Sequence, residues 1–341
     1  MINIAIIGAG NVAENFHLPA WKNIKGIKIV GIVDKNLNKA KLLSTKYRVK
    51  SSYQNIDTLF REQKVDAVDI CTPNKDHQKT IIYSLKKNKH VICEKPFVLN
   101  FKDFRKIKYL AKKKKLVCVA AQHQRFRQPS INLKKLVIKK KIGSIYTAHI
   151  SAIFKRSKTV KNSNFTNLSK AGGGPLIDLG SHFVDLAWWI MGKPKPISAS
   201  VYTSNKLAKY LEKNEKVFWK KFDIEDYASG VVRFEQNKSI TFQMSYLLNC
   251  KENEKNIKFF GTKGGLSWPN VELTTIKNNI TRNKSFFSKE KKSASILELQ
   301  HFIDSITKKR KQNPDLKEME TMTKIIETFH KSIYKNKEII I

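Results

Sequence analysis

The sequence predicts an α/β fold with two parts: a doubly wound parallel sheet, followed by an α+β domain with a large, mostly antiparallel open sheet. Two observations carry this prediction. Short apolar runs alternate with amphipathic stretches as far as about Ala121, and after about Gln122 the chain changes to longer strand-like segments with polar turns. Strands alternating with helices are typical of a parallel sheet covered on both faces. We therefore expect one domain at residues 1–122 and a second at residues 123–341.

The first domain is expected to contain five strands with helices between them. Right-handed crossovers between such strands produce the doubly wound arrangement. The predicted strands are Ile2–Ile7, Ile27–Val33, Val65–Cys71, His90–Cys93 and Leu116–Ala121. The clearest predicted helices are Leu37–Tyr47, Asp76–Lys87 and Phe101–Lys114.

The second domain is expected to mix long strands with a few helices. Its predicted strands include Gly143–Phe154, Ala228–Phe234 and Ser239–Leu247. Its predicted helices are Gly172–Met191, Ser295–Lys308 and Lys317–Tyr334. Two polar stretches, Ser157–Ala171 and Asn205–Lys221, are predicted to be loops. This combination is the pattern of an antiparallel sheet packed against helices.

The chain carries a formal net charge of +38, which admits two interpretations. One is a polyanionic partner such as nucleic acid or a membrane surface. The other is a codon-level bias toward lysine, asparagine and isoleucine. The basic runs are scattered along the chain, and no nucleic-acid-binding motif accompanies them. We favour the second interpretation and expect no specific nucleic-acid partner and no membrane partner, although the field would attract an anionic substrate.

Other global features restrict the class of protein. A length of 341 residues with 41% hydrophobic residues favours two folded domains. The first seven residues lead from Met1 directly into a strand-like run without a basic leader, so we expect a cytoplasmic protein. The four cysteines form no CxxC pair, so no metal site is predicted.

A glycine motif follows the first predicted strand and opens a helix. Gly8-Ala9-Gly10-Asn11-Val12-Ala13 matches the G-x-G-x-x-A pattern that turns a chain tightly and lets backbone amides approach a pyrophosphate. Asp34 ends the second predicted strand, where a carboxylate can accept the ribose hydroxyls of NAD and repel the additional phosphate of NADP. Because Lys35 is adjacent, NADP is kept as an alternative. We expect Gly8, Gly10, Asn11, Val12 and Asp34 to bind the cofactor.

Further candidate cofactor residues follow the third predicted strand. Ligands of doubly wound sheets bind beyond the carboxyl ends of the strands, so Thr72, Pro73 and Asn74 are expected to line the cofactor. His77 is a candidate for the same role, and a histidine on the helix surface is an equal alternative. His123 and Arg125 lie near the expected domain junction and are candidates for contact with nicotinamide or substrate. Arg156 is a weaker substrate candidate, for which a solvated face is the favoured interpretation.

Two further motifs give the chain a resemblance to a known family. Cys93-Glu94-Lys95-Pro96 and the run from Gly172-Gly173-Gly174 to Asp178 and His182 resemble the signatures of the Gfo/Idh/MocA oxidoreductases. Thr72-Pro73-Asn74, Arg125-Phe126 and Gly261-Thr262-Lys263-Gly264-Gly265 extend the resemblance over nearly the whole chain. It implies a Rossmann domain, NAD as cofactor and a homodimer or homotetramer.

The resemblance also implies roles for individual residues. Lys95 would lie beside the nicotinamide, together with Glu94, and polarise the reacting oxygen. Asp178 and His182 lie four residues apart on a predicted helix, roughly 40° apart around its axis with about 6 Å of rise, so both can face one pocket. His182 would exchange the hydroxyl proton. Asp178 would orient the imidazole or bind a neighbouring hydroxyl. A cis peptide bond before Pro96 is also expected.

Three functions follow from these features. The leading hypothesis is hydride transfer between NAD and a secondary alcohol of a sugar, a cyclitol or a sugar derivative, possibly one linked to a nucleotide, with Lys95, Asp178 and His182 as catalytic residues. The second is glycoside hydrolysis through transient oxidation, with NAD held tightly. The third is a non-enzymatic protein that binds polyanions.

Overall fold

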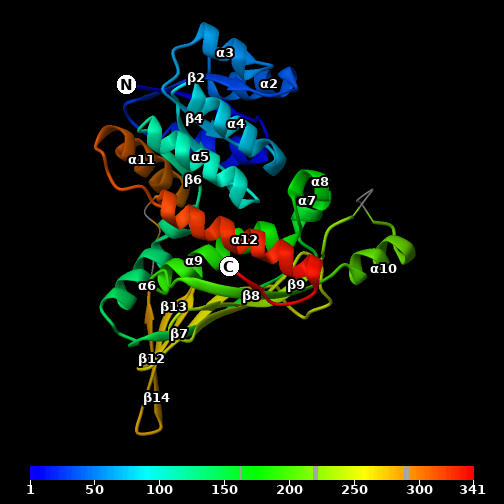
Figure 1. Cartoon of the computed structure of the whole chain (residues 1–341), viewed down its shortest axis with the longest axis vertical. Helices are drawn as coiled ribbons and strands as arrows, with labels where there is room; N and C mark the ends of the chain where they lie inside the picture. The colour runs from blue at the N-terminus through cyan, green and yellow to red at the C-terminus, as the bar shows by residue number, and fades with distance from the viewer. Residues whose placement is uncertain (162, 218–221, 288–289, 291) are drawn as a thin grey trace. The chain divides into compact units, whose positions relative to one another are not determined.

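The computed structural model describes residues 1–161, 163–217, 222–287, 290 and 292–341 (Figure 1). It divides into two compact units. The first contains Met1–His123 and Lys292–Thr323, and the second contains Gln124–Lys291 and Lys324–Ile341. The chain first passes between the units at His123 and Gln124, one residue after the division expected at residues 122 and 123, and it later returns to the first unit. This return has a physical cause, because Leu299, Phe302 and Ile303 are buried in the core of the first unit.

The first unit is built on a six-stranded parallel sheet of order β3-β2-β1-β4-β5-β6. Of the five strands predicted for it, three have the predicted bounds and two are shorter. A short β3 and helix α3 are additional to the prediction. The strands are β1 (Ile2–Ile7), β2 (Ile27–Val33), β3 (Ser52–Tyr53), β4 (Ala67–Ile70), β5 (His90–Cys93) and β6 (Cys118–Ala120).

Helices cover both faces of this sheet, as its alternating side chains require. Within β1, Ile4 and Ile6 belong to one hydrophobic cluster, and Ala5 and Ile7 belong to the other. The elements of this unit outside the sheet are a π-helical turn η1 (Ala13–His17), α1 (Leu18–Trp21), α2 (Leu37–Tyr47), α3 (Ile56–Glu62), α4 (Asn74–Lys86), α5 (Phe101–Lys113) and α11 (Ala294–Thr307). The doubly wound architecture is confirmed.

The second unit contains a nine-stranded sheet of order β14-β13-β12-β11-β7-β10-β9-β8-β15. Among the described residues, β7 and β10 form a parallel pair. The other neighbouring pairs of strands in this sheet are antiparallel. The mostly antiparallel sheet is thus confirmed. Its strands are β7 (Ile145–Ile153), β8 (Pro196–Ser204), β9 (Tyr227–Phe234), β10 (Lys238–Ser245), β11 (Glu254–Gly261), β12 (Gly264–Trp268), β13 (Val271–Lys277), β14 (Ile280–Phe286) and β15 (Ile339–Ile340).

Helix α9 (Pro175–Ile190) packs on this sheet against β7, β9 and β10. It is buried over most of its length because its sequence is apolar on nearly every side. The unit also contains α6 (Gln128–Ile138), and α12 (Leu316–Lys335) begins in the first unit and ends in the second. Among the described residues, no helix combines the length and apolar character needed to cross a bilayer.

The two predicted loops of the second unit contain helices instead. Ser157–Ala171 holds a 3-10 turn η3 (Lys158–Lys161) and the short helices α7 (Ser163–Thr166) and α8 (Leu168–Ala171). Asn205–Lys221 holds α10 (Lys206–Asn214), and residues 218–221 lie outside the described residues. The prediction of loops was wrong. It followed from the small number of apolar residues in both stretches. Ala208 and Leu211 are nevertheless buried, and with the partly buried Leu207 they hold α10 against a small hydrophobic cluster.

A buried ion pair stabilises the second unit. The Arg125 guanidinium donates from Nε and Nη2 to the two carboxylate oxygens of Asp185 on α9, at 2.7 and 2.6 Å. Both side chains are almost fully excluded from solvent, and the Trp189 ring lies 5.8 Å from the guanidinium. A bidentate pair of this kind fixes the orientation of both groups.

Removal of one partner should therefore be costly. We expect Asp185→Ala to lower the free energy of unfolding by about 3–5 kcal/mol, because it leaves a buried guanidinium without its counter-charge. The double variant Arg125→Met with Asp185→Leu should recover most of this loss. Urea unfolding of the three proteins measures the effect, and a loss under about 1 kcal/mol for Asp185→Ala would contradict it.

Candidate functional site

The predicted cofactor residues lie at the carboxyl edge of the six-stranded sheet. Gly8 follows β1, Asp34 follows β2, Thr72 comes two residues after β4, and Glu94 and Lys95 follow β5. The four strands are neighbours in the order β2-β1-β4-β5 and are mutually parallel, so all four end at the same edge. Adjacent strands are about 4.8 Å apart, so the strand ends of β1 and β5 are separated by roughly 10 Å.

The glycine loop has the geometry that the motif predicts. Gly8 has a φ of +104°, and a Cβ there would lie 2.7 Å from the Cys71 carbonyl oxygen. The loop therefore crosses the end of β4 too closely for any side chain. Gly10 is exposed, and a Cβ there would meet nothing within 4 Å. The space above Gly10 is thus open at the start of the following helical turn, where backbone N–H groups attract a phosphate.

Asp34 is held in place by backbone donors. Its Oδ2 accepts from the Ala9 N–H and its Oδ1 accepts from the Asn36 N–H, both at 2.8 Å. Each carboxylate oxygen has further lone pairs for ribose hydroxyls. The adjacent Lys35 ammonium lies 3.2 Å from the Asp76 carboxylate, so its charge is offset by another acid. These contacts reduce the ability of Lys35 to attract the additional phosphate of NADP.

The segment after β4 contains an unsatisfied polar atom. The Thr72 hydroxyl oxygen is buried and has no hydrogen-bond partner among the described residues, whereas Pro73 is exposed and Asn74 is half-buried. A buried hydroxyl without a partner is costly unless a ligand supplies one. This hydroxyl, the open space over Gly10 and the carboxylate of Asp34 fit a dinucleotide.

His77 is completely buried, so the helix-surface alternative is wrong. Its ring nitrogens lie 2.9 Å from the carbonyl oxygens of Thr72 and Pro96, which tie the end of β4 to the segment after β5. Burial lowers the pKa of His77. The Lys95–Pro96 peptide bond is cis, as expected from the sequence.

Glu94 is an acid at this edge whose pKa is strongly lowered. Burial by itself raises the pKa of its carboxyl, but the hydrogen bond and charge of His17, with the charges of Lys95 and His123, lower that pKa to about 2. Glu94 is therefore a carboxylate at neutral pH. Its Oε2 accepts from the backbone N–H of Lys95 at 3.0 Å. Lys95 itself is half-buried at this strand end, and His123 is also half-buried.

The second unit places Asp178 and His182 on one stripe of α9. Both are partly exposed, while twelve of the sixteen residues of this helix are buried. The Asp178 Oδ2 accepts from the hydroxyl of Tyr246 at 2.8 Å. Burial and the neighbouring Asp178 charge raise the pKa of Tyr246 well above its usual value, so the phenol keeps its proton and donates it. The stripe therefore presents a carboxylate and an imidazole together.

Glu225 fixes the start of this helix from a distant part of the chain. Its Oε2 accepts from the Gly174 N–H at 2.9 Å and its Oε1 accepts from the Leu176 N–H at 3.1 Å. It thereby caps the helix with a remote side chain. Glu225 and Tyr246 escaped the sequence analysis because neither belongs to a motif.

The remaining candidates have other partners. Arg125 is paired with Asp185, as described above. The Arg156 side chain is exposed and donates to the Lys155 carbonyl at 2.6 Å. Asn11 is exposed and accepts from Asn15 at 2.7 Å, and Val12 is half-buried against the first unit's core.

A potential metal cluster in the first unit is occupied by hydrogen bonds. His17, Asp69 and Cys71 bring three potential ligand atoms within 4.8 Å of one another. However, both ring nitrogens of His17 face carboxylates. Burial raises the pKa of the Cys71 thiol to about 12, so it keeps its proton and is a poor ligand.

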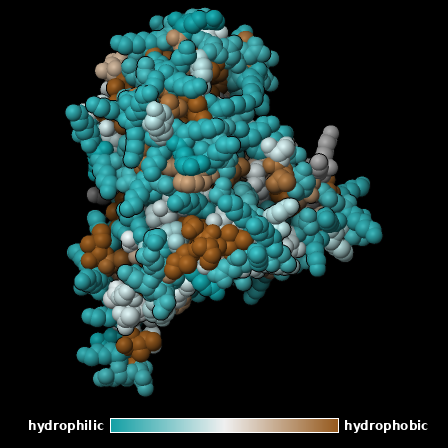
Figure 2. Space-filling model, in the orientation of Figure 1, coloured by the Kyte–Doolittle hydropathy of each residue, from teal (hydrophilic) through white to brown (hydrophobic). Residues whose placement is uncertain are grey.

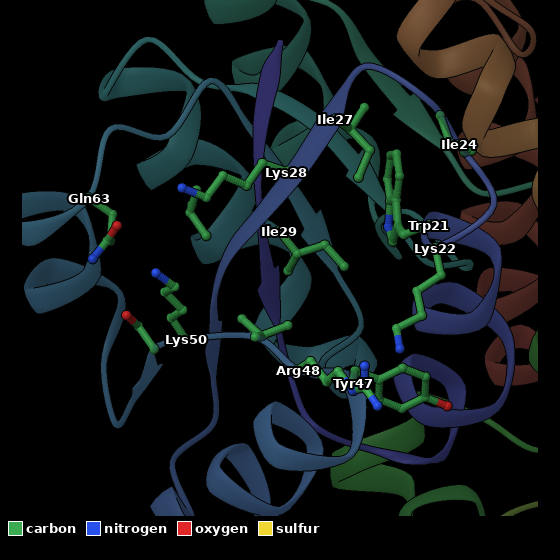
Figure 3. A pocket seen from close by; sticks show the side chains of 13 residues that line it. Trp21, Lys22, Ile24, Ile27, Lys28, Ile29, Tyr47, Arg48, Lys50 and Gln63 are labelled. Atoms are coloured by element: carbon green, nitrogen blue, oxygen red, sulfur yellow. The ribbon is translucent and has the colours of Figure 1, made fainter.

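An open pocket of the first unit is separate from the cofactor edge (Figure 3). It has a volume of about 400 Å³ and is lined by Ile27 and Lys28 at the amino end of β2, with Tyr47, Arg48 and Lys50 nearby. Gly8 and Asp34 lie at the carboxyl ends of β1 and β2. Since the strands are parallel, this pocket lies at the opposite edge of the sheet.

The fold and the strand-edge residues define a class of protein: a dinucleotide-binding domain followed by an α+β domain. Residues 2–122 match the GFO_IDH_MocA family, "Oxidoreductase family, NAD-binding Rossmann fold". Residues 131–267 match the "GFO/IDH/MocA C-terminal domain". The chain belongs to the Gfo/Idh/MocA family of NAD-binding oxidoreductases.

Individual relatives agree with this assignment. The chain is 28% identical over 280 residues to the D-glucoside 3-dehydrogenase of Escherichia coli, which covers 81% of this chain and 80% of the relative. It is 26% identical to the myo-inositol 2-dehydrogenase of Thermotoga maritima, with 89% and 88% covered. The fold is also similar to that of an oxidoreductase from Agrobacterium radiobacter, which was solved in complex with NAD+, L-tartaric acid and magnesium. The TM-score is 0.84 and the sequence identity is 18%, and the comparison covers 99% of this chain and 98% of that chain.

The two loop glycines provide a matched test of the glycine motif. We expect Gly8→Ala to destabilise the protein for two reasons. The new Cβ would collide with the backbone of Cys71, and residue 8 has a positive φ that alanine rarely adopts. Gly10→Ala should leave thermal stability nearly unchanged and weaken NADH binding, measured by fluorescence titration. Equal stability of the two variants would contradict this account of the loop.

Proposed function

We propose that the protein transfers a hydride between NAD and a secondary alcohol of a sugar, a cyclitol or a sugar derivative. The observation that carries the proposal is the order of residues along one sheet edge: Asp34, Gly8, Thr72 and Lys95 follow β2, β1, β4 and β5 in turn. A dinucleotide presents a ribose, a pyrophosphate and a nicotinamide in the same linear order. The dehydrogenases named above act on alcohols of this class, which supports the choice of substrate.

The proposed roles of the residues follow from their chemistry. When bound, NAD supplies the hydride acceptor or donor. The Lys95 ammonium polarises the substrate oxygen and stabilises the negative charge that develops on it. The His182 imidazole accepts the hydroxyl proton during oxidation and returns it during reduction. Asp178 binds a neighbouring hydroxyl or orients the imidazole, and the hydrogen bond from the Tyr246 hydroxyl fixes the direction of this carboxylate.

The rest of the cofactor site is proposed from the same edge. Glu94 neutralises part of the positive charge around Lys95, and Asn11, Val12, Pro73, Asn74 and His77 complete the loops on which the dinucleotide would lie. His123 is proposed to lie near the nicotinamide, in keeping with the effect of its charge on Glu94. Arg125 and Arg156 have protein partners, so we give them no direct role in the reaction.

Cytoplasmic location, a homodimer or homotetramer, and the absence of a specific nucleic-acid partner stay predictions. Figure 2 shows a face that is mostly hydrophilic, with hydrophobic patches separated from one another. Such a surface is typical of a strongly charged protein and does not by itself define a partner.

The role of Lys95 is tested directly by substitution. We expect Lys95→Ala to lower kcat on a reactive polyol by roughly 10²–10³-fold, because the charge on the oxygen loses its main stabilising group. NADH absorbance measures the rate. The control is Lys102→Ala, the same substitution at an exposed lysine of α5, and its kcat should match the wild-type value. Undiminished activity of Lys95→Ala would contradict the mechanism. Release of sugar without accumulation of NADH in the wild-type protein would instead favour the hydrolase alternative.

The role of Asp34 is tested by cofactor preference. We expect Asp34→Ser to raise the KM for NAD and to lower the KM for NADP, since the carboxylate both accepts ribose hydroxyls and repels the additional phosphate. The ratio of kcat/KM for the two cofactors should move toward NADP by roughly tenfold or more, equivalent to about 1.4 kcal/mol. The prediction fails if the ratio stays within twofold of the wild-type value, and Asp66→Ser, which alters an acid near the start of β4, serves as control.

A further inference from the structure

His17 lies in a π-helical turn immediately after the glycine loop. A π-turn contains one residue more than an α-helical turn, and such turns are frequent at functional sites. Asn15 and Phe16 of this turn are exposed, but His17 is only 3% exposed. The wider turn therefore directs one imidazole inward from the cofactor-binding loop toward the sheet.

The imidazole lies between two carboxylates from neighbouring strands. Its Nδ1 is 2.8 Å from the Oδ2 of Asp69, the third residue of β4. Its Nε2 is 2.9 Å from the Oε1 of Glu94, the residue that follows β5. A neutral imidazole carries one N–H and can donate to one of these acids. When both acids are ionised, both hydrogen bonds form only if the ring is an imidazolium.

The surroundings favour the imidazolium. Burial by itself lowers the pKa of His17, but the charge and hydrogen bond of Asp69 outweigh this effect and hold the pKa well above its usual value. The Trp21 indole N–H donates to the same Asp69 oxygen at 2.7 Å, and the Cys71 thiol donates to the other at 3.5 Å. Asp69 is therefore fixed from α1 and from its own strand.

A third acid near His17 has a raised pKa. Glu298 on α11 is 4% exposed, and burial, together with the charges of Glu94 and Asp69, raises its pKa well above the usual value despite the opposing charge of His17. The buried group thus brings three carboxyl groups, those of Asp69, Glu94 and Glu298, close to one imidazole. Lys95 and His123 add positive charge on the Glu94 side.

Glu94 connects this cluster to the proposed catalytic lysine. Its Oε1 faces His17 and its Oε2 accepts the backbone N–H of Lys95 at 3.0 Å. We propose that His17 is a positioning residue of the reaction, because its imidazolium clamps the Glu94 carboxylate and thereby holds the main chain of Lys95 at the carboxyl end of β5. This inference rests on the proposed function of Lys95. The contact between His17 and Glu94 thus connects the π-helical turn after the glycine loop to the end of β5, where Lys95 lies.

A purely structural role for His17 makes different predictions. A structural histidine would change stability and leave the turnover of the folded protein unchanged. A positioning histidine changes kcat while NADH binding is retained, because a displacement of about 1 Å at a reacting group can cost about 10²-fold in rate. The two roles are therefore separated by comparing kcat with cofactor affinity.

The experiment compares His17→Leu, His17→Gln and Glu94→Gln with the wild-type protein. We expect kcat of His17→Leu to fall by roughly 10–10²-fold, with the dissociation constant of NADH, from fluorescence titration, within about threefold of wild type. His17→Gln keeps one donor and should restore part of the loss. The control is His90→Gln at the opposite end of β5, where the ring accepts from the Val117 N–H at 2.9 Å. Its kcat should match the wild-type value.

A double-mutant cycle tests the connection through Glu94. If His17 acts through this carboxylate, the double variant His17→Leu with Glu94→Gln should be no slower than the slower single variant. Independent, multiplying losses in kcat would overturn the proposal, as would a wild-type kcat in folded His17→Leu.

Two readouts do not depend on activity. Nitrogen NMR of the wild-type protein should show both ring nitrogens of His17 protonated at pH 8, and a neutral ring would overturn the clamp. The free energies of unfolding of the wild-type protein, His17→Leu, Glu94→Gln and the double variant should show coupling between His17 and Glu94, and additive effects would likewise overturn it. If the wild-type protein oxidises no polyol at all, the proposed function fails, while these two measurements still decide whether the clamp exists.

Discussion

The constraint on which the rest of the account depends is the parallel alignment of β2, β1, β4 and β5. Parallel strands that are neighbours must end at the same edge, so residues distant in sequence come to lie in a row. Asp34, Gly8, Thr72 and Lys95 acquire their order from this alignment alone. An antiparallel sheet of the same strands would place alternate residues of this group at opposite edges.

Packing on the two faces of the sheet then fixes this edge in detail. One face is covered by α1, α2 and α11, and the other by α3, α4 and α5, so β2, β1, β4 and β5 are each held from both sides. Polar contacts complete the arrangement where the strands end. His77 ties the segment after β4 to the segment after β5, and His17 ties Asp69 to Glu94. In the second unit, Glu225 and Tyr246 similarly hold the start of α9 and its Asp178.

Much of the fold was predictable because its signals are local. The apolar runs of β1, β2 and β5 have the predicted bounds, since each is bordered by glycine or by polar residues. The glycine loop was predictable because only glycine tolerates the conformation at Gly8. Lys95, Asp178 and His182 were found through short motifs, and their roles in the reaction stay proposals.

The rest depended on contacts between distant residues. The partners of His17 are 52 and 77 residues away, and that of Arg125 is 60 residues away, so no periodicity reveals them. The return of α11 to the first unit is set by the burial of Leu299 and Phe302, which resemble any apolar helix face in sequence. Helix α10 was missed because its polar residues hide a narrow apolar stripe.

In the proposed reaction, a carbon-bound hydrogen passes directly between a polyol and the nicotinamide. Its most direct test uses a polyol deuterated at the reacting carbon, with unlabelled NAD in ordinary water and mass spectrometry of the reduced cofactor. We expect the NADH formed to be one mass unit heavier than unlabelled NADH, since hydride transfer carries the deuterium with its electron pair. Consumption of the polyol with unlabelled NADH, or with no NADH at all, would contradict it.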